Sequence, residues 1–434
     1  EGDTAASLRP WPRNLQMVLV DEMHDMNAAS FRVLRELLDS TQCQFCGVGD
    51  RDQVIYGAHG ADAVYMGDAI TVHTGRPVAR LPLTPSHRFG RKLATKAGRL
   101  ADKPYGSLAA HDTAVQLLGY DDEAECVDLI AHQVQHWRTA TRGKMAGLAV
   151  LLRHPGQSIA IENRLLADGV PYTVSGFESY LLRPEVLLVR GLLAVATDNF
   201  DSVTEPRTRE KLMRALVFFC GARIVVKGRE HESQHDLLAD AIRSVTDNPL
   251  FLESFFTNQI VPNVEPAMQR RLQSALKVAK EAHGQGTLAR LLEALQIEAV
   301  VREVFVSRQR RADALANLAG LSHAAQAFGS ARDYFLHLNA AEQRQRELRS
   351  TASLVLAHIG HVKGLEFEHV LIPYLEQGAF PDPQAPFAQE KNTLYVGMTR
   401  ARQQLTLLAH RQRPSAFVAQ LGYAESTQAA KAPA

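Results

Sequence analysis

The stretch Leu15-Gln-Met-Val-Leu-Val-Asp-Glu-Met-His-Asp25 decides the fold predicted for this chain. Its apolar run, Met17 to Val20, is typical of a fully buried strand of a parallel sheet, and the run ends in two adjacent carboxylates, Asp21 and Glu22. Open α/β sheets bind ligands outside the carboxyl ends of their strands. At such an edge one carboxylate can hold Mg²⁺ through water while the other accepts a proton from an attacking water. The pattern predicts a Walker-B-type site, although an ordinary strand end can carry the same pair.

Length and composition are those of an ordinary globular protein. The chain has 434 residues, 46% of them hydrophobic and 22% charged, which is enough for two or three domains with their own cores. The formal net charge of +1 excludes a strongly basic protein, so any contact with nucleic acid must come from local patches. No apolar stretch reaches the length of a membrane span and no signal pattern opens the sequence, so we expect a cytoplasmic protein without a membrane partner.

The cysteines give no support for a disulfide framework. There are only four of them, at positions scattered through the chain. Cys43 and Cys46 form a CxxC pair, but they lie in a strand predicted to be buried, from Gln42 to Val48, and no second pair follows at zinc spacing. The pattern favours a place in the core over a metal or redox role.

The residues after Asp25 predict a helix and a second strand. Asn27 is a plausible N-cap, and apolar residues follow at helical spacing from Phe31 to Leu38. The second buried strand ends in a polar loop that carries Gln53 and Tyr56. If the two strands are neighbours, both loops should share one cleft.

The rest of the chain alternates between strands and helices and then becomes helical. The alternating part predicts a mostly parallel sheet, and its elements are helix Glu123–Trp137, strand Gly147–Leu152, helix Gln157–Leu166, strand Val170–Val174 and a helix starting at Pro184. From Asp198 to Ser350 long helices are expected at Met268–Ala282, Leu288–Val304, Ala312–Phe328 and Ala331–Leu348. Strand character resumes at Ser353–Ile359, so the helical part interrupts the sheet domain.

Five segments, in order and at suitable intervals, resemble helicase motifs of the UvrD/Rep-type (superfamily 1) DNA helicases. They are Asp21-Glu-Met-His-Asp25, Gly49-Asp-Arg-Asp-Gln53-Val-Ile-Tyr56, Leu81-Pro-Leu-Thr-Pro-Ser-His87-Arg88-Phe89, His361-Val-Lys363-Gly364-Leu365-Glu366-Phe367 and Glu390-Lys-Asn-Thr-Leu-Tyr395-Val-Gly-Met-Thr399-Arg400-Ala-Arg402. The resemblance extends over residues 20–402, nearly the whole chain.

The resemblance implies ATP and Mg²⁺ as cofactors and gives each motif residue a role. Hydrolysis of a nucleoside triphosphate needs charge stabilisation and one positioned water. The implied catalytic roles are Mg²⁺ binding through water by Asp21, general base for Glu22, contact with the γ-phosphate or the water by Gln53, and cationic fingers for Arg88 and Arg400. The implied nucleotide contacts are adenine stacking by His87, the ribose contact of Glu366 and the adjoining Gly364. Tyr56, His59 and Lys363 would couple the site to DNA.

The fold class implied by the resemblance is α/β, with a partial first RecA-like domain and a complete second RecA-like parallel-sheet domain that a mainly helical insertion interrupts. The first domain would cover residues 1–85, the second residues 86–197 and 351–412, and the insertion residues 198–350. Residues 413–434, Ala-rich after Tyr423, are predicted to form a disordered tail. The partners would be single-stranded or partly duplex DNA and a protein met through the insertion, in a bacterial-type, nucleoid-associated setting.

The sequence also departs from the family pattern. The phosphate-binding G-x-x-x-x-G-K-S/T is absent from the 434 residues, so we expect the chain alone to bind ATP poorly and to be inactive. Ala58 and His59 stand where an aromatic and an arginine are common, His24 replaces a glutamine, and His358-Ile-Gly360 replaces Thr-x-His.

Two hypotheses follow from these observations. The first is the carboxy-terminal portion of an ATP-dependent DNA helicase or translocase, moving 3′ to 5′ on single-stranded DNA, whose phosphate loop lies upstream. The second is a degenerate, non-hydrolysing helicase-like module that binds DNA or a protein.

Overall fold

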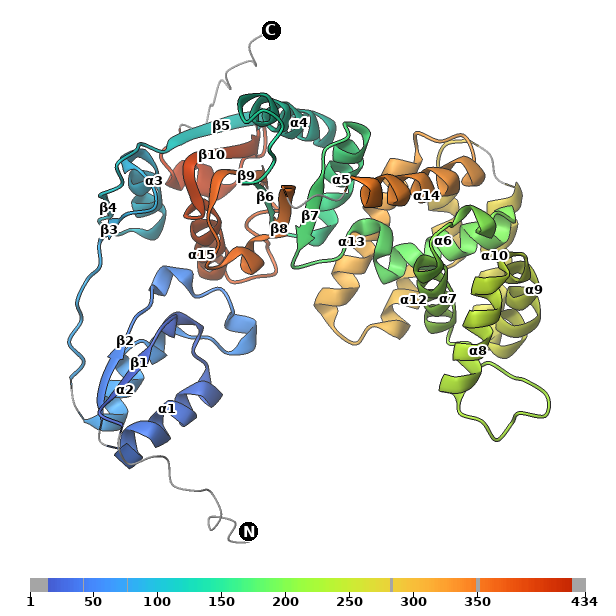
Figure 1. Cartoon of the computed structure of the whole chain (residues 1–434), viewed down its shortest axis with the longest axis horizontal. Coiled ribbons are helices and arrows are strands. Elements are labelled where there is room, and N and C mark those ends of the chain that lie inside the picture. Colours follow the sequence, from blue (N-terminus) through green and yellow to red (C-terminus); the bar gives the residue numbers. More distant parts are fainter. Residues whose placement is uncertain (1–14, 42, 76, 282–283, 349–351, 424–434) are drawn as a thin grey trace. The chain divides into compact units, whose positions relative to one another are not determined.

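The computed structural model describes residues 15–41, 43–75, 77–281, 284–348 and 352–423 (Figure 1). The chain divides into two compact units. The first unit comprises Glu1–Cys126, Gly147–Leu151 and Ile359–Ala434, and the second comprises Val127–Ala146 and Leu152–His358. No helix within the described ranges has the length and apolarity needed to cross a membrane. The domain boundaries implied by the resemblance remain a prediction.

The amino-terminal part of the first unit is a two-stranded parallel sheet with helices on one face. Strand β1 (Met17–Val20) pairs with β2 (Gln44–Gly47), and α1 (Ala28–Thr41) connects them. The side chain of Asn27 caps α1, because its Oδ1 accepts the Ser30 N–H at 3.0 Å. The core on this face contains Phe31 and Leu34 of α1 together with Ile70 of α2 (Asp68–Thr74). Val18, Val20 and Phe45 of the two strands pack against it. These contacts confirm the predicted strand, cap and helix.

The prediction that both strands are fully buried is wrong. Along β1 the side chains alternate between the helix-covered face and an open face, where Met17 is 49% exposed and Leu19 is 71% exposed. Cys46 of β2 is exposed and Cys43 is half-buried, both as free thiols, so they do not lie in a core. The reason is that, among the residues described, the helices cover this sheet on one face only.

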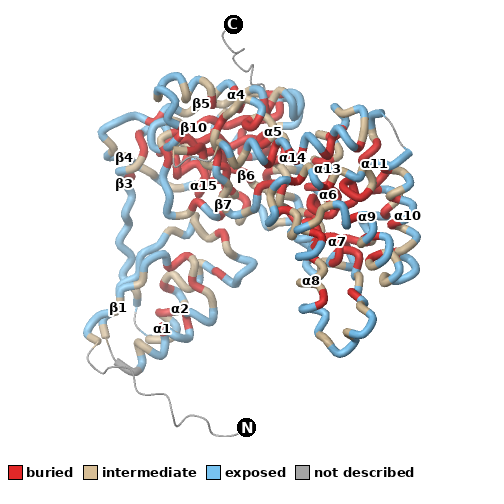
Figure 2. Tube along the Cα trace, turned by 45° about the vertical axis from the view of Figure 1, so that its right-hand side comes forward, coloured by how far each residue is buried: buried red, intermediate tan, exposed pale blue. Residues whose placement is uncertain are grey.

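The larger sheet has six strands in the order β5-β10-β9-β6-β8-β7. Their bounds are Ala114–Tyr120 for β5, Leu148–Leu152 for β6, Tyr172–Ser175 for β7, Leu354–His358 for β8, Phe367–Leu375 for β9 and Ala401–His410 for β10. The pairs β10–β5, β10–β9, β6–β9 and β7–β8 are all parallel. Every residue of β6 is buried, and Figure 2 shows β10 mostly buried as well. The predicted parallel α/β sheet is confirmed.

Helices and a short strand pair complete the sheet region. The bounds are Pro85–Ser86 for β3, Gly106–Ser107 for β4, Arg91–Ala101 for α3, Glu123–Ala140 for α4, Ser158–Ala167 for α5, Phe387–Met398 for α15 and Ala416–Gln420 for α16. Helix α15 packs against β9 and β10 (Figure 1). The expected disorder of residues 413–434 is wrong for its first part, because Phe417 of α16 is fully buried against Phe380 and Phe387. Residues 424–434 lie outside the described residues.

The second unit is mainly helical, as predicted for this part of the sequence. Its further helices are α6 (Pro184–Thr197), α7 (Pro206–Cys220), α8 (Gln234–Asp247), α9 (Leu252–Phe255), α10 (Pro266–Glu281), α11 (Thr287–Ala294), α12 (Ile297–Val304), α13 (Arg308–Ala325) and α14 (Ala331–Glu347). The single helix predicted at Leu288–Val304 is two helices, because Gln296 adopts a left-handed conformation with φ 53°. Local periodicity continues through this break and therefore does not reveal it.

A buried ion pair organises the centre of the second unit. Helix α6 is buried along nearly its whole length (Figure 2) and carries Arg190, which is 0% exposed. The guanidinium of Arg190 donates to Glu342 at 2.7 Å, to Asn339 at 2.9 Å and to the Leu181 carbonyl at 2.7 Å. These partners offset much of the cost of burying the charge, although Nε of the guanidinium has no hydrogen-bond partner among the described residues.

Candidate active site

The first candidate residues lie where β1 ends. Glu22 follows the strand in a left-handed conformation, with φ 51° and ψ 40°, and opens a 3₁₀ turn at Met23–Asp25. Its backbone N–H donates to Asp21 Oδ1 at 2.8 Å, and both carboxylates are exposed. A left-handed conformation at a residue other than glycine costs on the order of 1–3 kcal/mol and is found preferentially at functional sites. The turn therefore presents the two predicted carboxylates to solvent.

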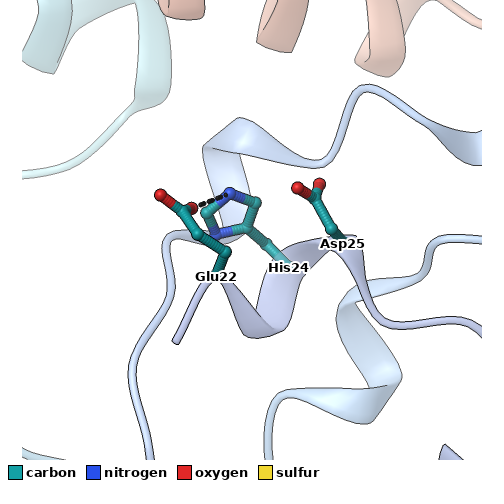
Figure 3. A group of neighbouring side chains, drawn as sticks. All are labelled: Glu22, His24 and Asp25. Carbon is teal, nitrogen blue, oxygen red and sulfur yellow. Dashed lines mark ion pairs between the residues drawn. The ribbon is translucent and has the colours of Figure 1, made fainter. Parts of the chain in front are cut away.

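Two further side chains of this turn pair with charged neighbours. His24 is buried, and its Nε2 lies 2.7 Å from Glu22 Oε2 (Figure 3). The carboxylate of Asp25 pairs with the ammonium of Lys363. Ligand atoms of Glu22, His24 and Asp25 lie within 4.8 Å of one another, which is compatible with a metal ion. Lys363 already engages Asp25, and His24 lies against Glu22.

The loop after β2 is held by the carboxylate of Asp50. This group accepts hydrogen bonds from Tyr395 OH at 3.0 Å, Lys103 Nζ at 2.9 Å and Gln53 Nε2 at 3.3 Å. Burial acts to raise the pKa of Asp50, but the hydrogen bonds from Lys103 and Gln53 outweigh it and leave the pKa below its ordinary value. Asp50 thus remains ionised and fixes the position of Gln53.

Two arginines contact Thr399, and one of them, Arg400, also reaches Gln53. Arg400 donates to Gln53 Oε1 at 3.4 Å and to Thr399 Oγ1 at 3.1 Å. Arg88 donates through Nη1 to the Thr399 carbonyl at 3.1 Å, and its Nε pairs with Glu366 Oε1 at 2.6 Å. The two guanidinium groups therefore converge on one residue, Thr399.

The guanidinium of Arg400 is held at an electrostatic cost. It is 3% exposed, and burial together with the like charge of Arg88 lowers its pKa to about 10, although Glu366 and Glu22 act in the opposite direction. An anion bound between the two guanidinium groups would relieve this repulsion, because each guanidinium presents a planar fork of donors that matches phosphate oxygens.

The residues predicted to couple the site to DNA contact one another and also reach Gln53 and Asp25. Tyr56 OH donates to the Gly360 carbonyl at 2.6 Å, and Lys363 Nζ lies 5.1 Å from the centroid of the Tyr56 ring. Lys363 also donates to the Gln53 carbonyl at 3.3 Å. Burial lowers the pKa of Lys363, and its pairing with Asp25 offsets part of that effect. His59 is exposed, with its ring edge-on to Tyr56 at 6.0 Å.

The structure thus brings together part of the predicted set. Direct contacts link Gln53, Arg400, Arg88 and Glu366, and Glu22 lies within electrostatic range of Arg400. His87 is exposed, and Gly364 has a left-handed φ of 80° with open space around it. The roles assigned to these residues remain predictions.

Sequence reasoning missed the groups that hold the site together. Asp50 and His24 stand within recognised motifs, but nothing in their spacing indicated the contacts that they make. Lys103 follows helix α3 and gave no signal, since an isolated lysine after a helix is usually a solvated group. Tyr395 lies in the core, with 1% of its surface exposed, and its hydroxyl group also binds Asp50.

The fold and these contacts together define a parallel α/β protein in which exposed carboxylates follow β1 and the amide of Gln53 after β2 contacts Arg400. Residues 110–412 match the family described as UvrD-like helicase C-terminal domain, and residues 3–70 match the UvrD/REP helicase N-terminal domain. The chain belongs to the UvrD-like helicase family.

Curated relatives agree with this assignment. The chain is similar to the ATP-dependent DNA helicase PcrA of Bacillus subtilis (strain 168), at 24% identity over 433 residues, which cover 92% of the chain and 55% of that protein. It is also similar to DNA helicase II of Escherichia coli (strain K12), at 26% identity over 427 residues, covering 90% and 55%. The chain therefore spans just over half the length of these relatives.

Proposed function

We propose that the chain supplies the hydrolytic and DNA-coupling residues of an ATP-dependent DNA helicase or translocase that moves 3′ to 5′ on single-stranded DNA. The observation that carries the proposal is the convergence of Arg400 and Arg88 on Thr399, with Arg400 in contact with Gln53. Two guanidinium groups held close together against their mutual repulsion suit an anion with several negative oxygens, such as the terminal phosphate of ATP.

The surrounding residues fit ATP with Mg²⁺ by their chemistry. Bound Mg²⁺·ATP would supply the phosphoanhydride bond that is hydrolysed. Asp21 would hold the metal through water, and Glu22 would accept a proton from the attacking water, since both are exposed carboxylates on one turn. Gln53 would contact the terminal phosphate or the water. Glu366 would contact the ribose, and His87 would stack on the adenine.

The DNA-coupling role would belong to Tyr56, His59 and Lys363. Tyr56 and Lys363 bridge the loop after β2 and the 3₁₀ helix Ile359–Val362 through hydrogen bonds to the carbonyls of Gly360 and Gln53. A shift of Gln53 on hydrolysis would therefore reach both side chains. This arrangement supports coupling between the nucleotide site and a bound strand, with the helical part of the second unit available for a protein partner.

The phosphate loop is the one component that the 434 residues do not contain, since G-x-x-x-x-G-K-S/T occurs nowhere among them. We propose that it is supplied by residues outside this sequence. The protein to assay is therefore the product of the complete gene.

The test is the DNA-stimulated ATPase rate of that product and of its Glu22→Gln variant. Removing a general base lowers kcat by about 10²–10⁴-fold, so E22Q should retain binding of single-stranded DNA and lose turnover. Glu298→Gln is the matched control, because Glu298 is an exposed carboxylate on α12. Equal rates for E22Q and wild type would refute the proposal.

A second candidate, a non-hydrolysing module that binds DNA or a protein, is favoured by the absent phosphate loop and by Ala58 and Gly360 at motif positions. It predicts no DNA-stimulated ATPase in the complete gene product and unchanged binding of single-stranded DNA in E22Q.

A further inference from the structure

His24 lies between the carboxylate of Glu22 and the loop that carries Gln53. Its Nε2 lies 2.7 Å from Glu22 Oε2, and its Nδ1 accepts the Asp50 N–H at 3.0 Å. Figure 3 shows the imidazole turned toward the Glu22 carboxylate. The side chain is only 2% exposed, so both contacts are shielded from water. One ring therefore contacts both segments that follow β1 and β2.

The two contacts fix the protonation of the ring. Since a backbone N–H donates to Nδ1, this nitrogen carries a lone pair and the proton resides on Nε2, facing Glu22. Burial lowers the pKa of His24, and Lys363 acts in the same direction, which outweighs the opposite effects of Glu22, Asp25 and Asp50. The neutral ring thus offers an acceptor to Asp50, while its Nε2 lies against the Glu22 carboxylate without the alignment of a hydrogen bond.

The close approach of the two segments is built into the sequence. A Cβ atom at Gly49 would lie 3.2 Å from His24 Nδ1, 3.2 Å from the His24 backbone nitrogen and 2.9 Å from Met66 Cε. A larger residue would require Met66 to move and the loop or the ring to shift slightly. The carboxylate of Asp50 in turn accepts from Gln53 and Tyr395, so the ring lies at the start of a chain of contacts that reaches the side chain of Gln53.

We propose that His24 is a positioning residue: its ring holds the carboxylate of Glu22 in place through the 2.7 Å contact at Nε2 and ties it through Nδ1 to the loop that carries Asp50 and Gln53. This role rests on the proposed function of Glu22 as general base. Through His24, the carboxylate of Glu22, which would activate water, and the side chain of Gln53, which would contact the phosphate, would move together. Glu22 also needs such a partner, because its left-handed backbone alone leaves an exposed side chain free to rotate.

Two substitutions separate the two contacts of the ring. In His24→Asn the carboxamide oxygen lies near the place of Nδ1 and can accept the Asp50 N–H, but nothing reaches Glu22. In His24→Gln the longer carboxamide nitrogen reaches the place of Nε2 and can keep the contact with Glu22, but the Asp50 N–H loses its acceptor. His24→Ala loses both contacts.

The first experiment needs no nucleotide and uses the complete gene product. Hydrogen exchange at the Asp50 amide, followed by mass spectrometry with fragmentation, should be unchanged in H24N and about tenfold faster in H24Q and H24A, as expected for loss of one hydrogen bond. Equal exchange in wild type and all three variants would overturn the tie between His24 and the loop.

The second experiment measures DNA-stimulated ATPase kinetics. H24N and H24A should lower kcat about 10- to 100-fold with KM for ATP unchanged, because a misplaced base slows chemistry without weakening binding. H24Q keeps the contact with Glu22 and should therefore restore kcat to within about threefold of wild type, the range that context dependence allows for a single contact. An equal loss of kcat in all three variants would overturn the role, because a general loss of packing would lower kcat regardless of which contact of the ring is kept.

A double substitution separates positioning from structure. If His24 acts through the carboxylate of Glu22, then adding H24N to E22Q should produce no further loss of kcat. A multiplicative loss would overturn the proposal. If E22Q itself equals wild type, the proposed function fails, whereas the exchange experiment still decides the tie to Asp50.

Discussion

The ammonium group of Lys103 is shared by two carboxylates of the loop after β2, and its removal gives a prediction that can be worked out from the structure. Nζ lies 2.9 Å from Asp50 Oδ1 and 2.7 Å from Asp52 Oδ2. Lys103→Met keeps the aliphatic stem, which lies beside the ring of Tyr395 (Nζ 4.7 Å from the centroid), and removes the charge. The substitution therefore isolates the electrostatic contribution.

The loss of stability expected for K103M lies between that for a buried charged contact and that for an exposed ion pair. A hydrogen bond to a charged group stabilises by about 1.5–3 kcal/mol, and an exposed ion pair by about 0–1 kcal/mol. The side chains of Lys103, Asp50 and Asp52 are 27%, 24% and 21% exposed, so solvent screens both contacts in part. We expect a total loss of ~2 kcal/mol, including the repulsion between the two carboxylates that remain.

Scanning calorimetry tests this expectation. For a folded unit of 150–250 residues, ~2 kcal/mol corresponds to a fall in Tm of about 4–8 °C. Lys144→Met, at an exposed lysine, is the matched control and should leave Tm unchanged. In a double-mutant cycle, Asp50→Asn should remove part of the effect of K103M. If K103M and K144M unfold at the same temperature, Lys103 does not hold the loop and the reasoning is refuted.

Three further predictions concern other charged groups. The pKa of His24 in the folded protein is lowered, so below the ordinary value of 6.5 the unfolded chain takes up a proton that the folded chain does not. The contribution of His24 to the free energy of unfolding should therefore be fully present above pH 6.5, and the free energy should fall by at most about 1.4 kcal/mol per pH unit below it. Urea denaturation between pH 7.5 and 5.5 should show this slope for wild type but not for H24Q, and a slope that persists in H24Q would contradict the assignment. Arg190→Leu should destabilise the second unit by about 3–5 kcal/mol, because Glu342 remains buried without its partner, and Glu342→Gln in the same chain should recover part of the loss in calorimetry. Pyrophosphate at 100 times its Kd should stabilise the protein by about 2.7 kcal/mol if the guanidinium groups of Arg88 and Arg400 bind it; a Tm shift that survives in Arg400→Met would place the anion elsewhere.

The sequence alone predicted the elements whose pattern is local. The run Met17–Val20, the helix capped by Asn27 and the buried strand at Leu148–Leu152 all follow from apolar spacing over a few residues, and each is present. The family, too, follows from residue types at set intervals, because the chemistry of a site restricts its residues more tightly than packing does. Local spacing failed at Gln296, where one left-handed residue divides a continuous apolar pattern.

Only the tertiary structure decided which groups meet. The open face of β1, the burial of Phe417 and the chain of contacts from Glu22 through His24 to Asp50 each depend on residues far apart in the sequence. Lys103 shows the physical reason most clearly. A lysine after a helix is solvated by default, and it becomes structural only because the fold places two carboxylates within 3 Å of its ammonium group. Sequence thus determined which chemical groups are present, and folding determined which of them are desolvated together and can act on one another.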